Sequence, residues 1–252
     1  MSQDMNLWYP ERGPWHKNIN FANKTVPFHS TDSGSEFTRN CNTESTRLLL
    51  EEYGWVDADI SYNYNYQGFR SEEFDSRPCG LAVGCSFTEG TGLPLEATWP
   101  SVLSEKLNIK VWNLGQGGAA LDTMFRLLDH YVDVFDPKFV AVCMPPQNRY
   151  EYFDRFGEYR IVMPTTMDDD RYKDFAKEWF GNPANSEQNT RRNILAMQYR
   201  CHERGIPMFV FDSQTQIKFD RAARDLQHPG RQAMQDFAST VHSTIIESGI
   251  KL

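Results

Sequence analysis

Short apolar segments alternate with helical patterns along most of the chain after residue 78. Four runs have the length and composition of buried strands: 81–85 (LAVGC), 109–114 (IKVWNL), 139–144 (FVAVCM) and 206–211 (IPMFVF). Helical patterns occupy 98–107, 121–135 and 187–203, and Pro229 opens a last one. Strands that alternate with helices pair in parallel, with helices on both faces of the sheet. The sequence therefore predicts an α/β fold, a three-layer α/β/α sandwich around a parallel sheet.

Two segments interrupt this alternation. Residues 1–77 are rich in aromatic side chains and show little periodicity, apart from a short helix expected at 43–53 and a strand expected at 60–66 (ISYNYNY). Residues 150–185 are aromatic and charged. We expect residues 1–77 to form an irregular arm packed on the core, residues 78–252 to form the main domain, and residues 150–185 to be an insertion in it.

Charge and apolar content exclude several classes of protein. The chain has 26 Lys and Arg against 34 Asp and Glu, a net charge of −8, whereas a general nucleic-acid binder needs a basic surface. No apolar run approaches the roughly 20 residues of a membrane span. The first residues lack the pattern of a secretory signal, and the five cysteines form no CxxC pair. We expect a cytoplasmic or virion-associated protein that binds no nucleic acid.

Polar and glycine-rich residues follow three of the expected strands. Residues 84–90 (GCSFTEG) place Ser86 directly after the first strand, 113–118 (NLGQGG) follow the second, and 145–148 (PPQN) follow the third. A further motif, 225–230 (DLQHPG), immediately precedes the last helix. Because the carboxyl ends of parallel strands lie at one edge of the sheet, we expect these segments to meet there.

These residue types suit acyl transfer. A serine hydroxyl becomes a nucleophile when a base removes its proton, and a carboxylate that orients the base assists. Of the six histidines, only His228 has an acidic residue, Asp225, three positions upstream. Negative charge that develops on a carbonyl oxygen is stabilised by fixed N–H donors, which Gly118 and Asn148 offer. For Ser86 to act as a nucleophile, His228, Asp225 and these donors have to lie close to it in the fold.

The order of these four segments resembles that of the SGNH (GDSL-like) hydrolase family, over roughly residues 80–247. The resemblance implies that Ser86 is the nucleophile, His228 the base and Asp225 the orienting carboxylate. It also implies an oxyanion hole formed by the backbone amide of Ser86, the amide of Gly118 and the side chain of Asn148. Metal ions and organic cofactors are not required by such a mechanism.

The resemblance leaves some positions open. Gly115 or Gly117 is an alternative to Gly118 as oxyanion donor. The family usually has Asp before its serine, where this chain has Cys85, and Asp after its asparagine, where this chain has Arg149. We interpret Cys85 as a buried small side chain, and Arg149 as a contact either for substrate or for an acidic residue. The acidic residues 168–170 fit a solvated loop better than a metal site.

The sequence therefore predicts a serine esterase that works through an acyl-enzyme. The preferred substrate is a short acyl group, such as acetyl, on a carbohydrate, because the arm is aromatic and no long apolar lid is evident. The alternatives are a lipid or aryl esterase or a thioesterase of the same family, and an inactive carbohydrate-binding module with the same fold. An α/β-hydrolase is excluded because Thr88 stands where its Gly-x-Ser-x-Gly motif needs glycine. The oligomeric state stays open.

Overall fold

A four-stranded parallel sheet lies at the centre of the computed structural model, which describes residues 8–9, 13–155, 159–164, 173–219 and 221–252. Its strand order is β10-β7-β5-β6. The strands are β5 (Cys79–Gly84), β6 (Lys110–Asn113), β7 (Val140–Met144) and β10 (Met208–Asp212). Each overlaps one of the four apolar runs, and every pairing is parallel. The predicted fold class is confirmed.

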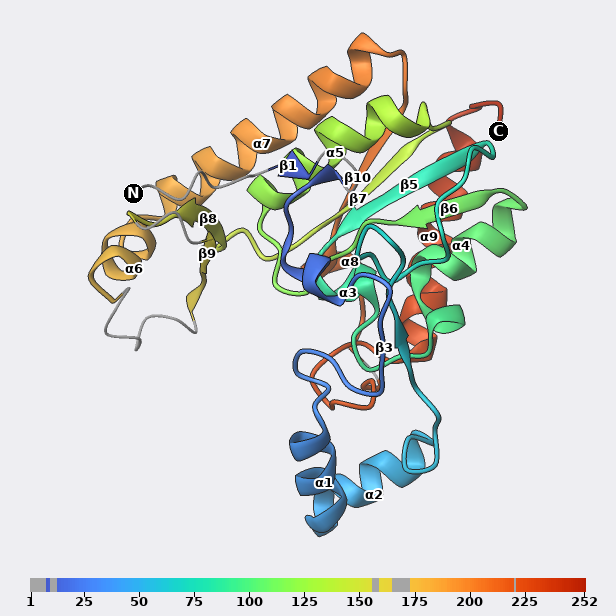
Figure 1. The fold of residues 1–252 in the computed structure, drawn as a ribbon, viewed down its shortest axis with the longest axis vertical. Helices are drawn as coiled ribbons and strands as arrows, with labels where there is room; N and C mark the ends of the chain where they lie inside the picture. The colour runs from blue at the N-terminus through green and yellow to red at the C-terminus, as the bar shows by residue number, and fades with distance from the viewer. Residues whose placement is uncertain (1–7, 10–12, 156–158, 165–172, 220) are drawn as a thin grey trace.

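Helices cover both faces of this sheet (Figure 1). One face packs against α4 (Trp99–Leu107) and α9 (Arg231–Glu247), and the other against α5 (Leu121–Phe135) and α7 (Pro183–Glu203). Side chains alternate along each strand, so Ala141 and Cys143 join the first core while Val140 and Val142 join the second. The runs are apolar throughout because both faces of the sheet are buried.

Segments that connect the strands carry shorter elements. The four-residue helices α3 (Ser86–Glu89) and α8 (Ser213–Gln216) follow the ends of β5 and β10. A 3₁₀ helix, η2 (Leu95–Ala97), precedes α4. The long α7 begins at Pro183 instead of residue 187, because Asn182 caps its first turn by accepting a hydrogen bond from the amide of Ala184 at 3.0 Å.

The first 77 residues contain more regular structure than the prediction allowed. They hold β1 (Trp8–Tyr9), β2 (Gly13–Pro14), η1 (Lys17–Phe21), β3 (Thr25–Val26), α1 (Gly34–Asn42), α2 (Glu44–Glu52) and β4 (Tyr62–Asn63). Helix α2 matches the helix expected at 43–53. Helix α1 was not predicted, although Ser33 caps it by accepting from the amide of Glu36, the capping spacing S-x-x-E.

The strand expected at 60–66 is wrong in extent. Only Tyr62 and Asn63 form a strand, β4, which pairs antiparallel with β3. Beyond them the chain turns, since the amide of Gly68 donates to the carbonyl of Asn65 at 2.9 Å and Gly68 has a φ of 85°. The alternation of side chains that predicted a strand therefore spans a turn.

Several side chains of the first 77 residues pack in the core of the sheet and its helices. Leu50, Trp55, Ile60, Tyr62 and Tyr64 are buried in the same core as α4 and α9. In Figure 1 the two arm helices, α1 and α2, lie at the end of the molecule away from α7. The boundary between residues 77 and 78 stays a prediction.

The described residues between 150 and 185 form secondary structure of their own, while their origin as an insertion stays a prediction. A hairpin of β8 (Tyr150–Phe153) and β9 (Tyr159–Val162) is followed by α6 (Lys173–Phe180). Figure 1 shows this unit beside the N-terminal half of α7. The acidic residues 168–170 lie outside the described residues. Among the helices that the structure describes, none combines the length and apolarity of a membrane span.

Candidate active site

Ser86 lies at the turn between a strand and a helix. Strand β5 ends at Gly84, Cys85 occupies the position before the helix, and Ser86 is the first residue of α3. Gly84 is needed there because a Cβ would lie 1.8 Å from the Oγ1 of Thr88. The amide of Ser86 donates to no described residue, so it is available to a ligand. Cys85 is 1% exposed, which agrees with its interpretation as a buried small side chain.

Asp225 and His228 lie in a loop that a β-bridge between Ala222 and Pro229 closes, just before α9. The Nε2 of His228 lies 2.8 Å from the Oγ of Ser86, and its Nδ1 lies 2.6 Å from the Oδ2 of Asp225. Ser86, His228 and Asp225, which the sequence analysis singled out, are thus connected by a continuous chain of hydrogen bonds in the structure. Serine and histidine are 142 positions apart in the sequence.

The surroundings of Asp225 favour its ionised form. Burial by itself raises the pKa of this carboxyl, which is 3% exposed. Hydrogen bonds from His228, Thr31 and the amide of Gln227, with the attraction of His228, outweigh burial, so the pKa of Asp225 lies below its usual range. An ionised carboxylate only accepts hydrogen bonds. The carboxylate therefore accepts a hydrogen bond from the N–H at Nδ1 of His228. Nε2 then carries no proton and accepts the hydrogen bond from the hydroxyl of Ser86.

The strand order explains how the oxyanion candidates approach the serine. Strand β5, which leads to Ser86, lies between β6 and β7. Gly118 follows β6 and Asn148 follows β7, so both come from the strand ends that flank the serine. Asn148 is half-buried. This placement is the one that the sequence analysis expected, while the part of either residue in an oxyanion hole stays a prediction.

The alternatives to Gly118 are narrowed by the local hydrogen bonds. The amide of Gly115 already donates to the Oδ1 of Asn113 at 2.8 Å, which removes it as a donor to substrate. The amides of Gly117 and Gly118 donate to no residue in the described ranges. Gly118 has a φ of 78°, a conformation that favours glycine, and a Cβ at Gly117 would lie 2.8 Å from a carboxylate oxygen of Glu89.

Arg149, which follows the candidate donor Asn148, has a structural contact. Its Nη1 donates to the carbonyl oxygen of Ala119 at 3.2 Å. Ala119 directly follows Gly118, so this bond connects the segment of Asn148 to the glycine turn. The contact therefore helps to hold the segments of Gly118 and Asn148 in position relative to each other.

A cavity of about 580 Å³ borders Asn148. Both polar and apolar side chains line it, one of them an aromatic ring: Gln147, Asn148, Pro164, Phe180, Pro183, Ser186, Glu187 and Gln214. Gly118 lies near this segment, because a Cβ on Gly118 would lie 3.8 Å from the Cε of Met163, the neighbour of Pro164. Within the described ranges, no group of three or more His, Cys, Asp or Glu residues is placed to hold a metal ion.

Sequence reasoning missed two residues beside the site. Thr31 of the arm donates from Oγ1 to the Oδ2 of Asp225 at 2.7 Å, across 194 positions of sequence. Glu89, in the serine motif, is completely buried and accepts from Asn18 at 2.6 Å and from Tyr64 at 3.0 Å. No local pattern indicates Thr31, whereas the position of Glu89 inside the serine motif is a local signal that could have indicated it.

Comparison with known proteins finds similar solved structures. No family model and no curated protein matches the sequence. The esterase EstA from Pseudoalteromonas is 16% identical, with 69% of this chain and 98% of that chain covered and a TM-score of 0.40. The acetyl xylan esterase Est2A from Butyrivibrio proteoclasticus is 11% identical, with 70% and 65% covered and a TM-score of 0.40.

A further similar structure is AlinE4, described as an esterase of the SGNH-hydrolase family. It is 15% identical, with 68% of this chain and 75% of that chain covered and a TM-score of 0.35. These proteins are esterases, and AlinE4 bears the family name that the four sequence motifs indicated. At such identities and TM-scores, the role of each residue has to be argued from the geometry of this chain.

Proposed function

We propose that this chain is a serine esterase of the SGNH type, with Ser86 as nucleophile, His228 as base and Asp225 as orienting carboxylate. The observation that supports it most is the continuous chain of hydrogen bonds from Ser86 Oγ to His228 Nε2, at 2.8 Å, and from His228 Nδ1 to Asp225 Oδ2, at 2.6 Å. The first distance is that of a nucleophile paired with its base, and the second is that of a base hydrogen-bonded to the group that orients it.

In the proposed acylation step, Ser86 Oγ forms a bond to the ester carbonyl carbon while its proton moves to Nε2 of His228. The carbonyl oxygen becomes an oxyanion, which accepts from the free amide of Ser86, the amide of Gly118 and the side-chain amide of Asn148. The bond to the alcohol then breaks, and the leaving oxygen takes the proton from Nε2. Asp225 remains ionised throughout and stabilises the imidazolium of His228.

Deacylation repeats these events with water. His228 Nε2 removes a proton from the water, whose oxygen attacks the acyl carbon. The second tetrahedral intermediate collapses, Ser86 Oγ recovers its proton from Nε2, and a carboxylic acid leaves. No group beyond those of the chain and water is needed to balance the step.

We propose a short acyl group on a carbohydrate as the substrate. The cavity beside Asn148 supports this choice, because amide, hydroxyl and carboxylate groups suit the hydroxyls of a sugar and Phe180 offers a ring to its apolar face. A lipid or aryl esterase, a thioesterase and an inactive carbohydrate-binding module are the alternatives that experiment has to exclude.

Hydrolysis of p-nitrophenyl acetate by wild type, Ser86→Ala and His228→Ala tests the proposal. We expect each variant to lose about 10³-fold or more of kcat/KM. His228→Ala is expected to unfold at nearly the wild-type temperature. Equal rates in wild type and Ser86→Ala would refute the role of Ser86, and a large loss of stability in His228→Ala would identify His228 as structural.

A substrate panel separates the alternatives. Acetylated xylans and other acetylated polysaccharides are compared with an acyl thioester and with nitrophenyl esters. The acyl chains of these nitrophenyl esters have roughly two to twelve carbons, from short to long. A preference for the acetylated polysaccharides supports the proposed substrate. A preference for long chains or thioesters contradicts it, and binding of polysaccharide without turnover of any ester indicates the inactive module.

A further inference from the structure

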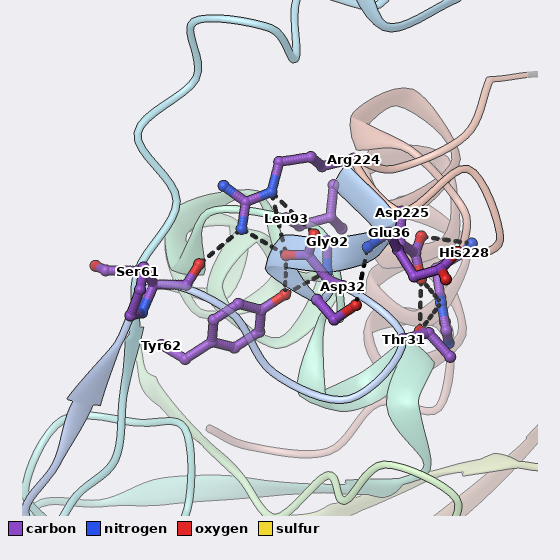
Figure 2. Close-up of polar contacts among 12 residues, drawn as sticks. Thr31, Asp32, Glu36, Ser61, Tyr62, Gly92, Leu93, Arg224, Asp225 and His228 are labelled. Carbon is purple, nitrogen blue, oxygen red and sulfur yellow. Dashed lines mark hydrogen bonds and ion pairs between the residues drawn. The ribbon is translucent and has the colours of Figure 1, made fainter. Parts of the chain in front are cut away.

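An arm residue, Thr31, contacts the candidate catalytic acid directly. Its hydroxyl donates to Oδ2 of Asp225 at 2.7 Å, the same oxygen that accepts from Nδ1 of His228 at 2.6 Å. The hydroxyl oxygen also lies 3.5 Å from that Nδ1. Figure 2 shows the three side chains grouped in this way. Oδ2 of Asp225 therefore receives two donors, one from its own loop and one from the arm.

The other oxygen of Asp225 is held by its own loop. Oδ1 accepts from the amides of Gln227 and His228, each at 3.1 Å. All four hydrogen bonds together fix the plane of the carboxylate. Thr31 provides the one that comes from outside the loop, so its hydroxyl opposes rotation of the carboxylate away from the imidazole.

A buried ion pair anchors the arm beside this contact. Asp32, which follows Thr31, accepts from Arg224, which precedes Asp225: Oδ1 at 2.9 Å from Nε and Oδ2 at 2.6 Å from Nη2. Both side chains are buried, with 1% of Asp32 and 5% of Arg224 exposed. Such a bidentate pair has a specific geometry. Two successive residues of the arm, Thr31 and Asp32, are thus paired with two successive residues, Asp225 and Arg224, of the loop between Ala222 and Pro229 (the catalytic loop).

Two further bonds hold the same pair in place. The hydroxyl of Tyr62 donates to Oδ2 of Asp32 at 2.6 Å, and Arg224 Nη2 donates to the carbonyl of Pro27 at 2.8 Å. The hydroxyl of Tyr62 in turn accepts from the amide of Gly92 at 2.7 Å. Figure 2 shows Asp32 between Tyr62 and Arg224. The position of Thr31 is therefore determined by contacts of residues before it (Pro27) and after it (Asp32) in the arm.

We propose that Thr31 is a positioning residue of the active site and that the N-terminal arm, through its hydroxyl, completes the catalytic apparatus. The inference rests on the proposed esterase function. The hydroxyl acts through Asp225, whose orientation determines how Nε2 of His228 faces Ser86. Loss of the hydroxyl allows the carboxylate and imidazole to leave the productive geometry, which lowers the rate of the chemical step and leaves substrate binding unchanged.

Steady-state kinetics of Thr31→Val, Thr31→Ser and Thr25→Val test this inference. Thr31→Val keeps the shape and removes the hydroxyl, Thr31→Ser keeps the hydroxyl, and Thr25→Val is the matched control. Thr25 is also in the arm and also donates a hydroxyl, to Asn63 at 2.6 Å, but does not contact the catalytic loop. Rates are expressed per serine that a fluorophosphonate labels, which counts only folded, reactive protein.

We expect Thr31→Val to lower kcat about tenfold with KM within about twofold of wild type. Thr31→Ser is expected to recover most of kcat, and Thr25→Val to match wild type. Thr31→Ala, which places no methyl group against the carboxylate, is the second variant if Thr31→Val fails to fold, and the same loss of kcat is expected.

The possible failures are distinguishable. Wild-type kcat in Thr31→Val or Thr31→Ala, in a protein whose activity depends on Ser86, overturns the inference and leaves the esterase function intact. An equal loss in Thr25→Val, or no recovery in Thr31→Ser, shows a general effect of the arm and also overturns it. Absence of any activity that depends on Ser86 in wild type refutes the proposed function and the inference together.

Discussion

The buried histidine His16 of the arm makes the stability of the fold depend on pH. His16 is completely buried, its Nε2 donates to the carbonyl of Gln67 at 2.8 Å, and its Nδ1 accepts from the side-chain amide of Gln116 at 2.6 Å. Burial is the main reason that the pKa of His16 falls to about 4. The bond to Gln67 opposes this shift, and the charge of Arg126 adds to it. Folded His16 is therefore neutral at pH 5.

The size of the effect follows from the two pKa values. An unfolded histidine has a pKa of about 6.5, so between about pH 6.5 and 4 the unfolded chain binds a proton that the folded chain does not. Stability is therefore complete above the unfolded pKa and is lost as the pH falls toward the folded pKa. From pH 7 to pH 5, His16 costs about 2 kcal/mol of unfolding free energy.

Urea unfolding of wild type and His16→Gln at both pH values measures this cost. Glutamine retains a donor and an acceptor but does not titrate. His29, whose pKa burial also lowers, is present in both proteins, so the difference between them isolates His16. We expect wild type to lose about 2 kcal/mol more than His16→Gln between pH 7 and pH 5. Equal losses in the two proteins would refute a neutral, buried His16.

Two further predictions concern the site itself. Gly84→Ala should lower the unfolding free energy by about 1–3 kcal/mol in urea titrations, since its Cβ would overlap the Oγ1 of Thr88. The control Gly34→Ala, whose Cβ would meet Phe28 at 3.4 Å, should have nearly the unfolding free energy of wild type. An unchanged unfolding free energy in Gly84→Ala would contradict the tight turn. Asp225→Asn should lower kcat about 10²- to 10⁴-fold at pH 7, because the amide does not hold the His228 tautomer, whereas kcat near wild type would show that Asp225 is not the orienting acid.

The sheet and its helices could be predicted because their signals are local. In β5 and β7 both faces are buried, so the strands are short continuous apolar runs, and α5 places its apolar side chains at helical spacing. That functional loops gather at the carboxyl ends of the strands then follows from a general rule of parallel sheets. Ser86, Gly118 and Asn148 could be assigned to that edge without coordinates for this reason.

The arm could not be predicted in the same way because its order comes from distant contacts. Helix α1 places only two apolar side chains, Phe37 and Cys41, against the core, and its fully buried residue is the polar Asn40. Its apolar pattern is therefore short, and the Ser33–Glu36 cap is its other local signal. Thr31 faces Asp225 because Asp32 pairs with Arg224, a contact between residues 192 positions apart. Similarly, Gly115 is excluded as a donor to substrate because its amide already donates to the side-chain oxygen of Asn113, a bond that no motif describes.

The most direct test of the catalytic assignment is covalent labelling with a fluorophosphonate, followed by peptide mass spectrometry. A serine that His228 activates reacts with this electrophile, whereas an ordinary buried hydroxyl does not. We expect one label per chain (roughly stoichiometric) on the peptide that contains Ser86, and almost none in His228→Ala. Labelling of another residue, or labelling of Ser86 that is as fast without His228, would contradict the proposed triad.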